Sequence, residues 1–271
     1  MSEQTRFYNP YELNAEYILI PGGKHRFSVT NQDIEVPPVY FARFPVTNKN
    51  YRRFLDYLSK TGKSDIVNIL PFSDFEKSLL KKAKTIDGFA RYLSEDSTSW
   101  AEKLRAADDR HFGRDDQPVV MVNWFAAAAY CHWLAQIPLA GNLAFVYQLP
   151  TEAAWEWAAA GRGKGGKPRL YPWGDEKPDD SRANYDQIIG HTTGNGYYPA
   201  GYTPEGLSDM GGNVWELTKK EPQHGKLLPA PVLRGGSWVN EPEYLRCDAR
   251  VEVVPARKAD DTGFRVVYAT Q

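Results

Sequence analysis

The sequence has little cysteine, almost no net charge and no long hydrophobic run. Cys131 and Cys247 are the only cysteines in 271 residues, which excludes a framework of several disulfides but leaves one bridge or two free thiols possible. With 33 basic and 34 acidic side chains, the chain lacks the bulk charge that holds nucleic acid or an anionic membrane surface. No stretch of about eighteen apolar residues is present, so we expect no membrane partner.

The first residues also lack a basic stretch followed by an apolar segment, the pattern of a secretory signal. The scarcity of cysteine is consistent with a reducing compartment, and we therefore expect a cytoplasmic protein. Hydrophobic residues make up 42% and charged residues 25% of the chain, ordinary values for a globular protein with a buried core.

Aromatic and chain-turning residues are abundant: eight Trp, 16 Tyr, 12 Phe, 22 Gly and 19 Pro. Large aromatic side chains supply burial where the backbone turns often, so this composition predicts a loop-rich fold. Alternating apolar residues predict short strands over 16–21, 25–29 and 38–45, which form a small antiparallel element. Further short strands are expected near 232–234 and 264–268.

Three helices are predicted, each from a capping residue that precedes an apolar pattern. The second, over 124–134, is hydrophobic nearly all round and is expected to be buried. The first helix is predicted to be capped by Thr47 or Asn48 and to end at Gly62. The second is capped by Asn123 and ends at Leu134, and the third is capped by Thr151 and ends at Gly161.

Residues 63–117 differ from the rest, because scattered aromatics stand there among many charged residues. This pattern predicts two or three surface helices inserted into the domain. No internal repeat and no Pro/Gly/Ser-rich linker divides the chain. We therefore predict a single domain over 1–271 with a helical insertion at 63–117.

Short motifs follow one another in a fixed order along the chain. They are Pro45–Asn48, Gln117–Trp124, Tyr130–Trp133, Leu149–Trp155, Tyr171–Asp175, Gly206–Glu216, Leu233–Trp238, Arg246–Arg250 and Gly263–Arg265. In these motifs the chain resembles the formylglycine-generating enzyme (sulfatase-modifying factor) family over roughly residues 16–269. The resemblance implies an α+β fold of the C-type-lectin-like kind with little regular secondary structure, in agreement with the loop-rich composition.

The founding activity of that family is copper-dependent oxidation of a sulfatase cysteine to formylglycine, with two cysteines that bind Cu(I) as soft thiolates. Asn240 and Leu245 stand at the positions that match those cysteines. Neither side chain is a Cu(I) ligand, so we expect no copper and no formylglycine-generating activity. Cys247 lies two residues further on, and Cys131 lies on the apolar helix, where a cysteine usually acts as a small hydrophobe.

The resemblance also implies structural calcium. The matching loop would supply the carboxylates of Asp209 and Glu216 and the backbone carbonyls of Gly212 and Val214, an all-oxygen set that suits a hard cation. A second family site would fall at Asn184 and Tyr185. The downstream carboxylate of this weaker site is replaced around Thr192, although Asp186 could compensate.

The resemblance favours a binding module that uses the surface of the former active site to recognise a peptide, a protein or a small molecule. The same scaffold carries the variable ligand-binding proteins of diversity-generating retroelements, and this chain could be of that type. Loops held on a rigid base suit recognition. The residues expected to line the groove are Trp238, Asn240, Tyr244, Arg246 and Asp248.

Two other functions stay open at this point. One is an oxidoreductase or biosynthetic enzyme of the same family with a different chemistry, in which the polar groove residues would act. The five histidines form no pair at helical metal-ligand spacing, which argues against the iron site of the related sulfoxide synthases. The other is an accessory subunit whose insertion at 63–117 docks a partner.

Overall fold

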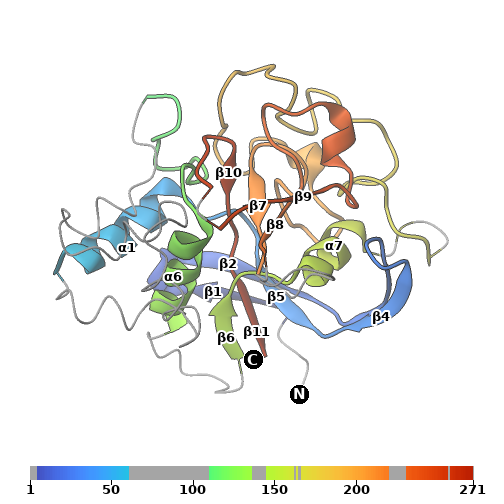
Figure 1. The fold of residues 1–271 in the computed structure, drawn as a ribbon, viewed down its shortest axis with the longest axis horizontal. Helices are drawn as coiled ribbons and strands as arrows, with labels where there is room; N and C mark the ends of the chain where they lie inside the picture. Colours follow the sequence, from blue (N-terminus) through green and yellow to red (C-terminus); the bar gives the residue numbers. More distant parts are fainter. Residues whose placement is uncertain are drawn as a thin grey trace.

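The protein is described from a computed structural model, which covers residues 5–60, 110–135, 145–161, 163, 166–219, 230–255 and 257–270 (Figure 1). The insertion predicted at 63–117 lies outside the described residues apart from 110–117. The helices are α1 (Asn48–Lys60), α6 (Trp124–Ala135) and α7 (Glu152–Ala160), with short 3-10 turns η1 (Pro10–Glu12), η3 (Pro199–Gly201) and η4 (Pro242–Leu245). The strands are β1 (Arg6–Asn9), β2 (Ala15–Ile20), β3 (Gly23–Phe27), β4 (Gln32–Val36), β5 (Val39–Ala42), β6 (Phe145–Gln148), β7 (Trp215–Leu217), β8 (Val232–Arg234), β9 (Arg250–Glu252), β10 (Thr262–Gly263) and β11 (Val267–Thr270).

A five-stranded antiparallel sheet, in the order β1-β2-β5-β11-β6, separates two hydrophobic cores. Successive side chains of a strand point to opposite faces, so neighbours on one strand enter different cores. Tyr17 packs with α1 and α6, whereas Ile18 packs with α7. Figure 1 shows α1 and α6 together on one side of this sheet and α7 on the other.

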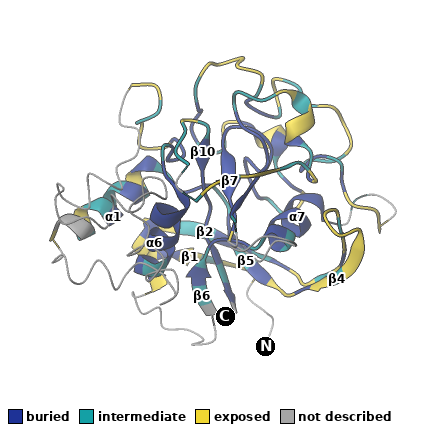
Figure 2. Ribbon diagram, in the orientation of Figure 1, coloured by how far each residue is buried: buried dark blue, intermediate teal, exposed yellow. Residues whose placement is uncertain are grey.

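A second, smaller sheet in the order β10-β7-β8-β9 carries the C-terminal loops. Its strands β10 and β7 run parallel, whereas the other neighbours are antiparallel. Figure 2 shows β7 and β10 among the buried parts of the chain, while β4 of the β3–β4 hairpin is largely exposed. Long loops that connect short buried strands account for the abundance of glycine and proline.

The predicted helix starts are confirmed. The side chains of Thr47, Asn123 and Thr151 accept hydrogen bonds from Asn50 N, Ala126 N and Ala154 N, respectively, at 3.0–3.2 Å. Helix α6 is buried on almost every side, as its uniformly apolar sequence predicts. Helix α7 ends at Gly161, where φ is +45°.

The structure confirms an α+β fold with short antiparallel strands. The composition did not predict β1 or β4, because their sequences are polar and their burial is low. β1 pairs with β2, and β4 pairs with β3. Backbone hydrogen bonds hold these strands, and a polar sequence pattern does not reveal such bonds.

Candidate functional site

Three loops far apart in the sequence, at 184–187, 209–216 and 237–240, meet at the candidate site. Asn213 N donates to Asn184 O at 2.8 Å, and Trp238 N donates to Asn213 O at 3.1 Å. The 184–187 loop returns to the third loop through two donors, Asp186 N to Asn240 O at 2.8 Å and Gln187 N to Trp238 O at 2.7 Å. These backbone bonds join both predicted calcium loops to the predicted groove.

The side chain of Asn213 is the centre of this junction, and the sequence analysis did not single it out. Its Oδ1 accepts hydrogen bonds from Thr193 N at 2.9 Å and from Asn184 Nδ2 at 3.2 Å, and its Nδ2 donates to Thr193 O at 3.2 Å. Asn213 is 1% exposed and has a φ of +66°. Asparagine tolerates this left-handed conformation better than most residues. The residue type at position 213 was therefore the signal in the sequence that could have pointed to this role.

The residues at the two positions that match the copper cysteines have structural roles. Asn240 Oδ1 accepts hydrogen bonds from Ser237 N at 3.0 Å and Ser237 Oγ at 2.6 Å, which closes the loop on itself. Leu245 is fully buried in a small core with Tyr171 and Ala183. The residues present do not fit a Cu(I) dithiolate site.

Both cysteines are free and buried, in different hydrophobic cores. Burial raises the pKa of Cys131 and of Cys247 far above the ordinary range. A thiol that stays protonated is a poor soft-metal ligand and a poor nucleophile. The open choice between a bridge and two free thiols is therefore decided in favour of free thiols.

Asp209 lies beside the junction with its side chain almost fully buried. Its Oδ2 accepts hydrogen bonds from Gly196 N at 3.0 Å and Ser208 Oγ at 2.8 Å. Burial is the largest effect on this group and raises the pKa of Asp209 despite the two donors and the nearby Arg265. A calcium ion on this carboxylate would offset the cost of burying its charge.

Glu216, the second predicted carboxylate ligand, already has strong partners. Arg265 donates to its two oxygens at 2.5 and 2.7 Å, and Trp155 Nε1 donates to Oε2 at 2.8 Å. An ionised carboxylate has roughly four acceptor positions, so about one remains for a cation. The assignment of calcium to Asp209 and Glu216 stays a prediction, with Glu216 as the more constrained ligand.

The weaker predicted calcium site contains buried oxygens without donors. Asn184 Oδ1 and Thr192 Oγ1 are buried and form no hydrogen bond in the described part of the chain. Unpaired buried oxygens are costly unless a donor or cation meets them, and oxygen is the ligand type that a hard cation takes. Asp186 is exposed, whereas Asn184 is buried, and Tyr185 uses its hydroxyl to reach Pro178 O at 3.3 Å.

Two of the predicted groove residues present aromatic rings at the surface. Trp238 is half-buried, with Phe112 at 5.8 Å between ring centroids and its Nε1 bonded to Asp260 O at 3.1 Å. Tyr244 is 43% exposed, and its ring meets the edge of Trp215 at 6.0 Å. Backbone bonds fix both loops, so each ring is held in place by the fold.

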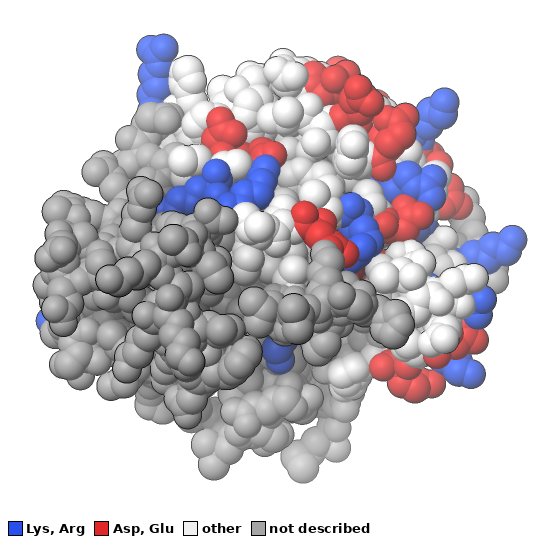
Figure 3. Space-filling model, viewed as in Figure 1, with Lys and Arg blue, Asp and Glu red and all other residues white. Residues whose placement is uncertain are grey.

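Arg246 and Asp248, the charged residues predicted for the groove, are joined to each other. Two hydrogen bonds of 2.8 Å link the guanidinium to the carboxylate, and Arg246 is the main cause of the lowered pKa of Asp248. This pairing reduces the charge that either residue offers to a ligand. Figure 3 shows basic and acidic side chains close together over much of the described part of the face in view.

Two features are absent from the described residues. No three His, Cys, Asp or Glu side chains within the described ranges form a group that could hold a metal ion. No helix in the same ranges is long and apolar enough to cross a membrane. The calcium sites expected here depend in large part on amide and carbonyl oxygens.

The loop-rich α+β fold recurs in solved structures. PvdO from Pseudomonas aeruginosa superposes with a TM-score of 0.63 at 20% identity, covering 99% of this chain and 100% of that one. Treponema denticola variable protein 1 gives a TM-score of 0.58 at 20% identity over 95% of each chain. The class is thus the formylglycine-generating-enzyme type of C-type-lectin-like fold, as expected.

The family follows from the sequence comparison. Residues 4–270 match the sulfatase-modifying factor enzyme 1-like domain, and the chain belongs to this family. It is 27% identical over 276 residues to the "Inactive C-alpha-formylglycine-generating enzyme 2" of Bos taurus, covering 92% of this chain and 86% of that protein.

Proposed function

We propose that this protein is a ligand-binding module on a calcium-stabilised formylglycine-generating-enzyme scaffold, with the surface around Trp238 and Tyr244 as the binding site. The observation that carries the proposal is the replacement of the copper cysteines by Asn240, which closes its own loop, and by the buried Leu245. The bovine relative bears the word "inactive" in its name, which supports a role without formylglycine generation.

Aromatic rings on rigid loops suit this role. Exposed tyrosine and tryptophan supply contact area with few rotatable bonds, so little entropy is lost on binding. Ile188 and Ile189, which are 53% and 42% exposed, follow Gln187, whose N donates to Trp238 O. Because Arg246 and Asp248 neutralise each other, we expect a partly apolar peptide or protein segment as the ligand.

The first prediction is that the protein does not oxidise a Cys-x-Pro-x-Arg peptide, even with Cu(I) and oxygen supplied, because no pair of accessible thiolates exists. Mass spectrometry of the peptide checks this. Copper-dependent turnover that Cys247→Ser abolishes would show that the protein is an oxidase.

Binding is tested by panning a displayed peptide library on the wild-type protein, with Trp238→Ala in a counter-selection. We expect peptides that lose about tenfold or more in affinity on Trp238→Ala, since aromatic anchors carry much of the binding energy. Tyr8→Ala is the control, because Tyr8 is 60% exposed and belongs to β1. Selected peptides that bind both variants equally would place the site elsewhere.

The second prediction concerns Asp209 and calcium. Without calcium, the raised pKa means that the folded chain favours the protonated carboxyl, so this group costs stability as the pH rises from its ordinary pKa through the raised value. Asp209→Asn should therefore raise the unfolding free energy at neutral pH in EDTA. With calcium the order should reverse, because the ion binds the carboxylate and stabilises the native state by about 2.7 kcal/mol at 100 times Kd.

Thermal unfolding in EDTA and in calcium, at pH 5 and pH 7, checks the second prediction. Asp180→Asn serves as the control, because Asp180 is exposed. An equal calcium response of wild type and Asp209→Asn would show that Asp209 does not bind the ion.

A further inference from the structure

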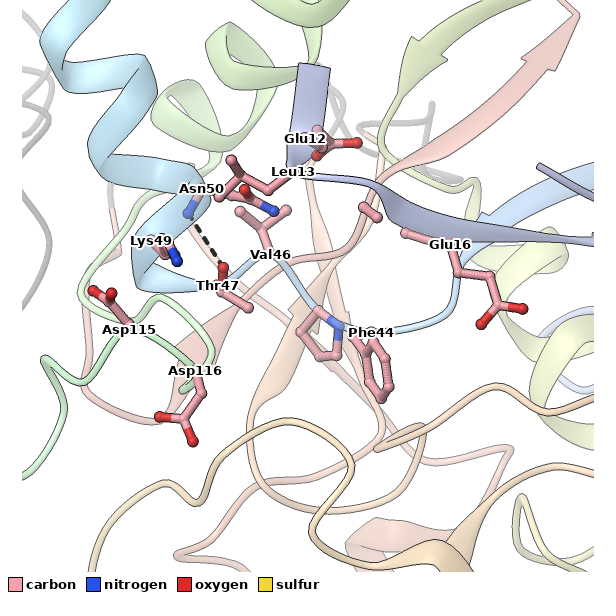
Figure 4. Close-up of a pocket in the computed structure, with 13 residues that line it drawn as sticks. Glu12, Leu13, Glu16, Phe44, Val46, Thr47, Lys49, Asn50, Asp115 and Asp116 are labelled. Carbon is pink, nitrogen blue, oxygen red and sulfur yellow. Dashed lines mark hydrogen bonds between the residues drawn. The ribbon is translucent and has the colours of Figure 1, made fainter. Parts of the chain in front are cut away.

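A cavity at the start of α1 shares no lining residue with the proposed Trp238 site. Its volume is about 350 Å³, within the range of small-molecule pockets. Figure 4 shows the lining side chains, which come from η1 and the start of β2, the end of β5 and its connection to α1, the first turn of α1, and the 110–117 loop. Phe44, Pro45 and Val46 form an apolar wall.

The connection to the 110–117 loop is held by backbone and amide bonds. Lys49 N donates to Asp115 O at 3.2 Å, and Asn48 Nδ2 donates to Phe112 O and Arg114 O at 2.6 and 2.9 Å. Since these bonds join two walls of the cavity, its shape is fixed by the fold before any ligand enters.

The described part of the chain places four carboxylates at this cavity, and three of them are paired with arginines. Glu16 binds both Arg6 and Arg43, at 2.6 and 2.8 Å. The other two pairs are Asp115 with Arg52 at 2.6 Å and Asp116 with Arg114 at 3.4 Å.

Glu12, the fourth carboxylate, is buried and has only uncharged donors. It accepts hydrogen bonds from Tyr130 Oη at 2.8 Å, from Asn9 Nδ2 at 3.1 Å and from the Tyr17 hydroxyl. Burial raises the pKa of Glu12 and so disfavours its ionised form. The acidic residues therefore leave little charge free to attract a cation.

Two lining groups remain available. Lys49 is exposed and forms no ion pair with the described residues, and among these residues no other lysine or arginine lines the cavity. Asn50 Oδ1 is buried and accepts no hydrogen bond within the described ranges. One free ammonium group, one free acceptor and an apolar wall together define the chemistry of a ligand that would match the cavity.

We propose that this cavity binds a small organic carboxylate that also carries an N–H or O–H donor and a short apolar group. The carboxylate would meet Lys49 Nζ, the donor would meet Asn50 Oδ1, and the apolar group would lie against Phe44 and Val46. The inference depends on the cavity alone, so its test is independent of the test of binding at Trp238.

The test uses 4-fluorohippurate as a probe in ligand-observed fluorine NMR with the full chain. We expect binding that Lys49→Met weakens about tenfold, the usual value of one charge-assisted hydrogen bond. The isosteric 3-(4-fluorobenzoyl)propionate, which has CH₂ in place of the N–H, should bind about three- to tenfold more weakly, because Asn50 Oδ1 then stays unpaired. Lys24→Met is the control, since Lys24 is an exposed residue of β3.

Four outcomes would overturn the proposal. They are no binding at millimolar probe, equal binding to Lys49→Met, equal binding of the uncharged 4-fluorohippuramide, and tighter binding of 4-fluorophenethylamine. The last would mean that the carboxylates, and not Lys49, select the ligand. A Trp238→Ala variant should bind the probe like wild type, which separates this cavity from the proposed peptide site.

Discussion

Replacement of Arg265 by methionine is expected to lower the free energy of unfolding by about 3–5 kcal/mol, the usual cost of breaking a buried ion pair. Arg265 is 0% exposed and donates to both oxygens of Glu216. It also donates to the backbone carbonyls of Ala42, Arg43 and Ser208 at 2.8–3.1 Å. The variant would leave a buried carboxylate and three carbonyls without this donor.

Chemical denaturation measures the effect, and Arg26→Met provides the matched control. Arg26 forms an ion pair with Asp33, but both side chains are more than half exposed, at 55% and 52%. Such surface pairs contribute about 0–1 kcal/mol. A loss below about 1 kcal/mol for Arg265→Met would show that Glu216 finds other partners. A calcium ion is the first such partner to test, by repeating the measurement in EDTA.

The second large effect is expected at Gly235, in the Arg-Gly-Gly-Ser-Trp motif beside the candidate site. Its φ is +94°, and a Cβ there would stand 2.9 Å from Met210 O and 3.0 Å from the ring of Trp155. Alanine would combine the strain of a left-handed backbone, about 1–2 kcal/mol, with an overpacking cost of about 1–3 kcal/mol. We expect Gly235→Ala to lose roughly 2–5 kcal/mol and to weaken binding at Trp238.

Gly190 separates the two contributions to this loss. It also has a positive φ, +80°, but nothing lies within 4 Å of a Cβ built there. Gly190→Ala should therefore show the backbone strain alone, about 1–2 kcal/mol. Equal losses for the two variants in denaturant unfolding would mean that the close approach to Met210 O and Trp155 contributes nothing.

Local chemistry was readable from the sequence where neighbours along the chain decide the outcome. The helix starts at Thr47, Asn123 and Thr151 depend on a side chain that reaches a backbone N–H three residues away. The missing copper thiols depend only on residue types at two positions. The burial of α6 follows from its sequence, which is apolar on nearly every side of the helix.

The sequence by itself therefore determined the fold class, the principal helices and the loss of the copper ligands. Tertiary structure alone decided how Glu216 is satisfied, since Arg265 is 49 residues away and no local pattern pairs them. It also placed Asn213 between the 184–187 and 237–240 loops and left Asn50 Oδ1 unpaired beside Lys49. These features arise when chain closure brings distant segments together, so they depend on three-dimensional distance and not on spacing along the chain.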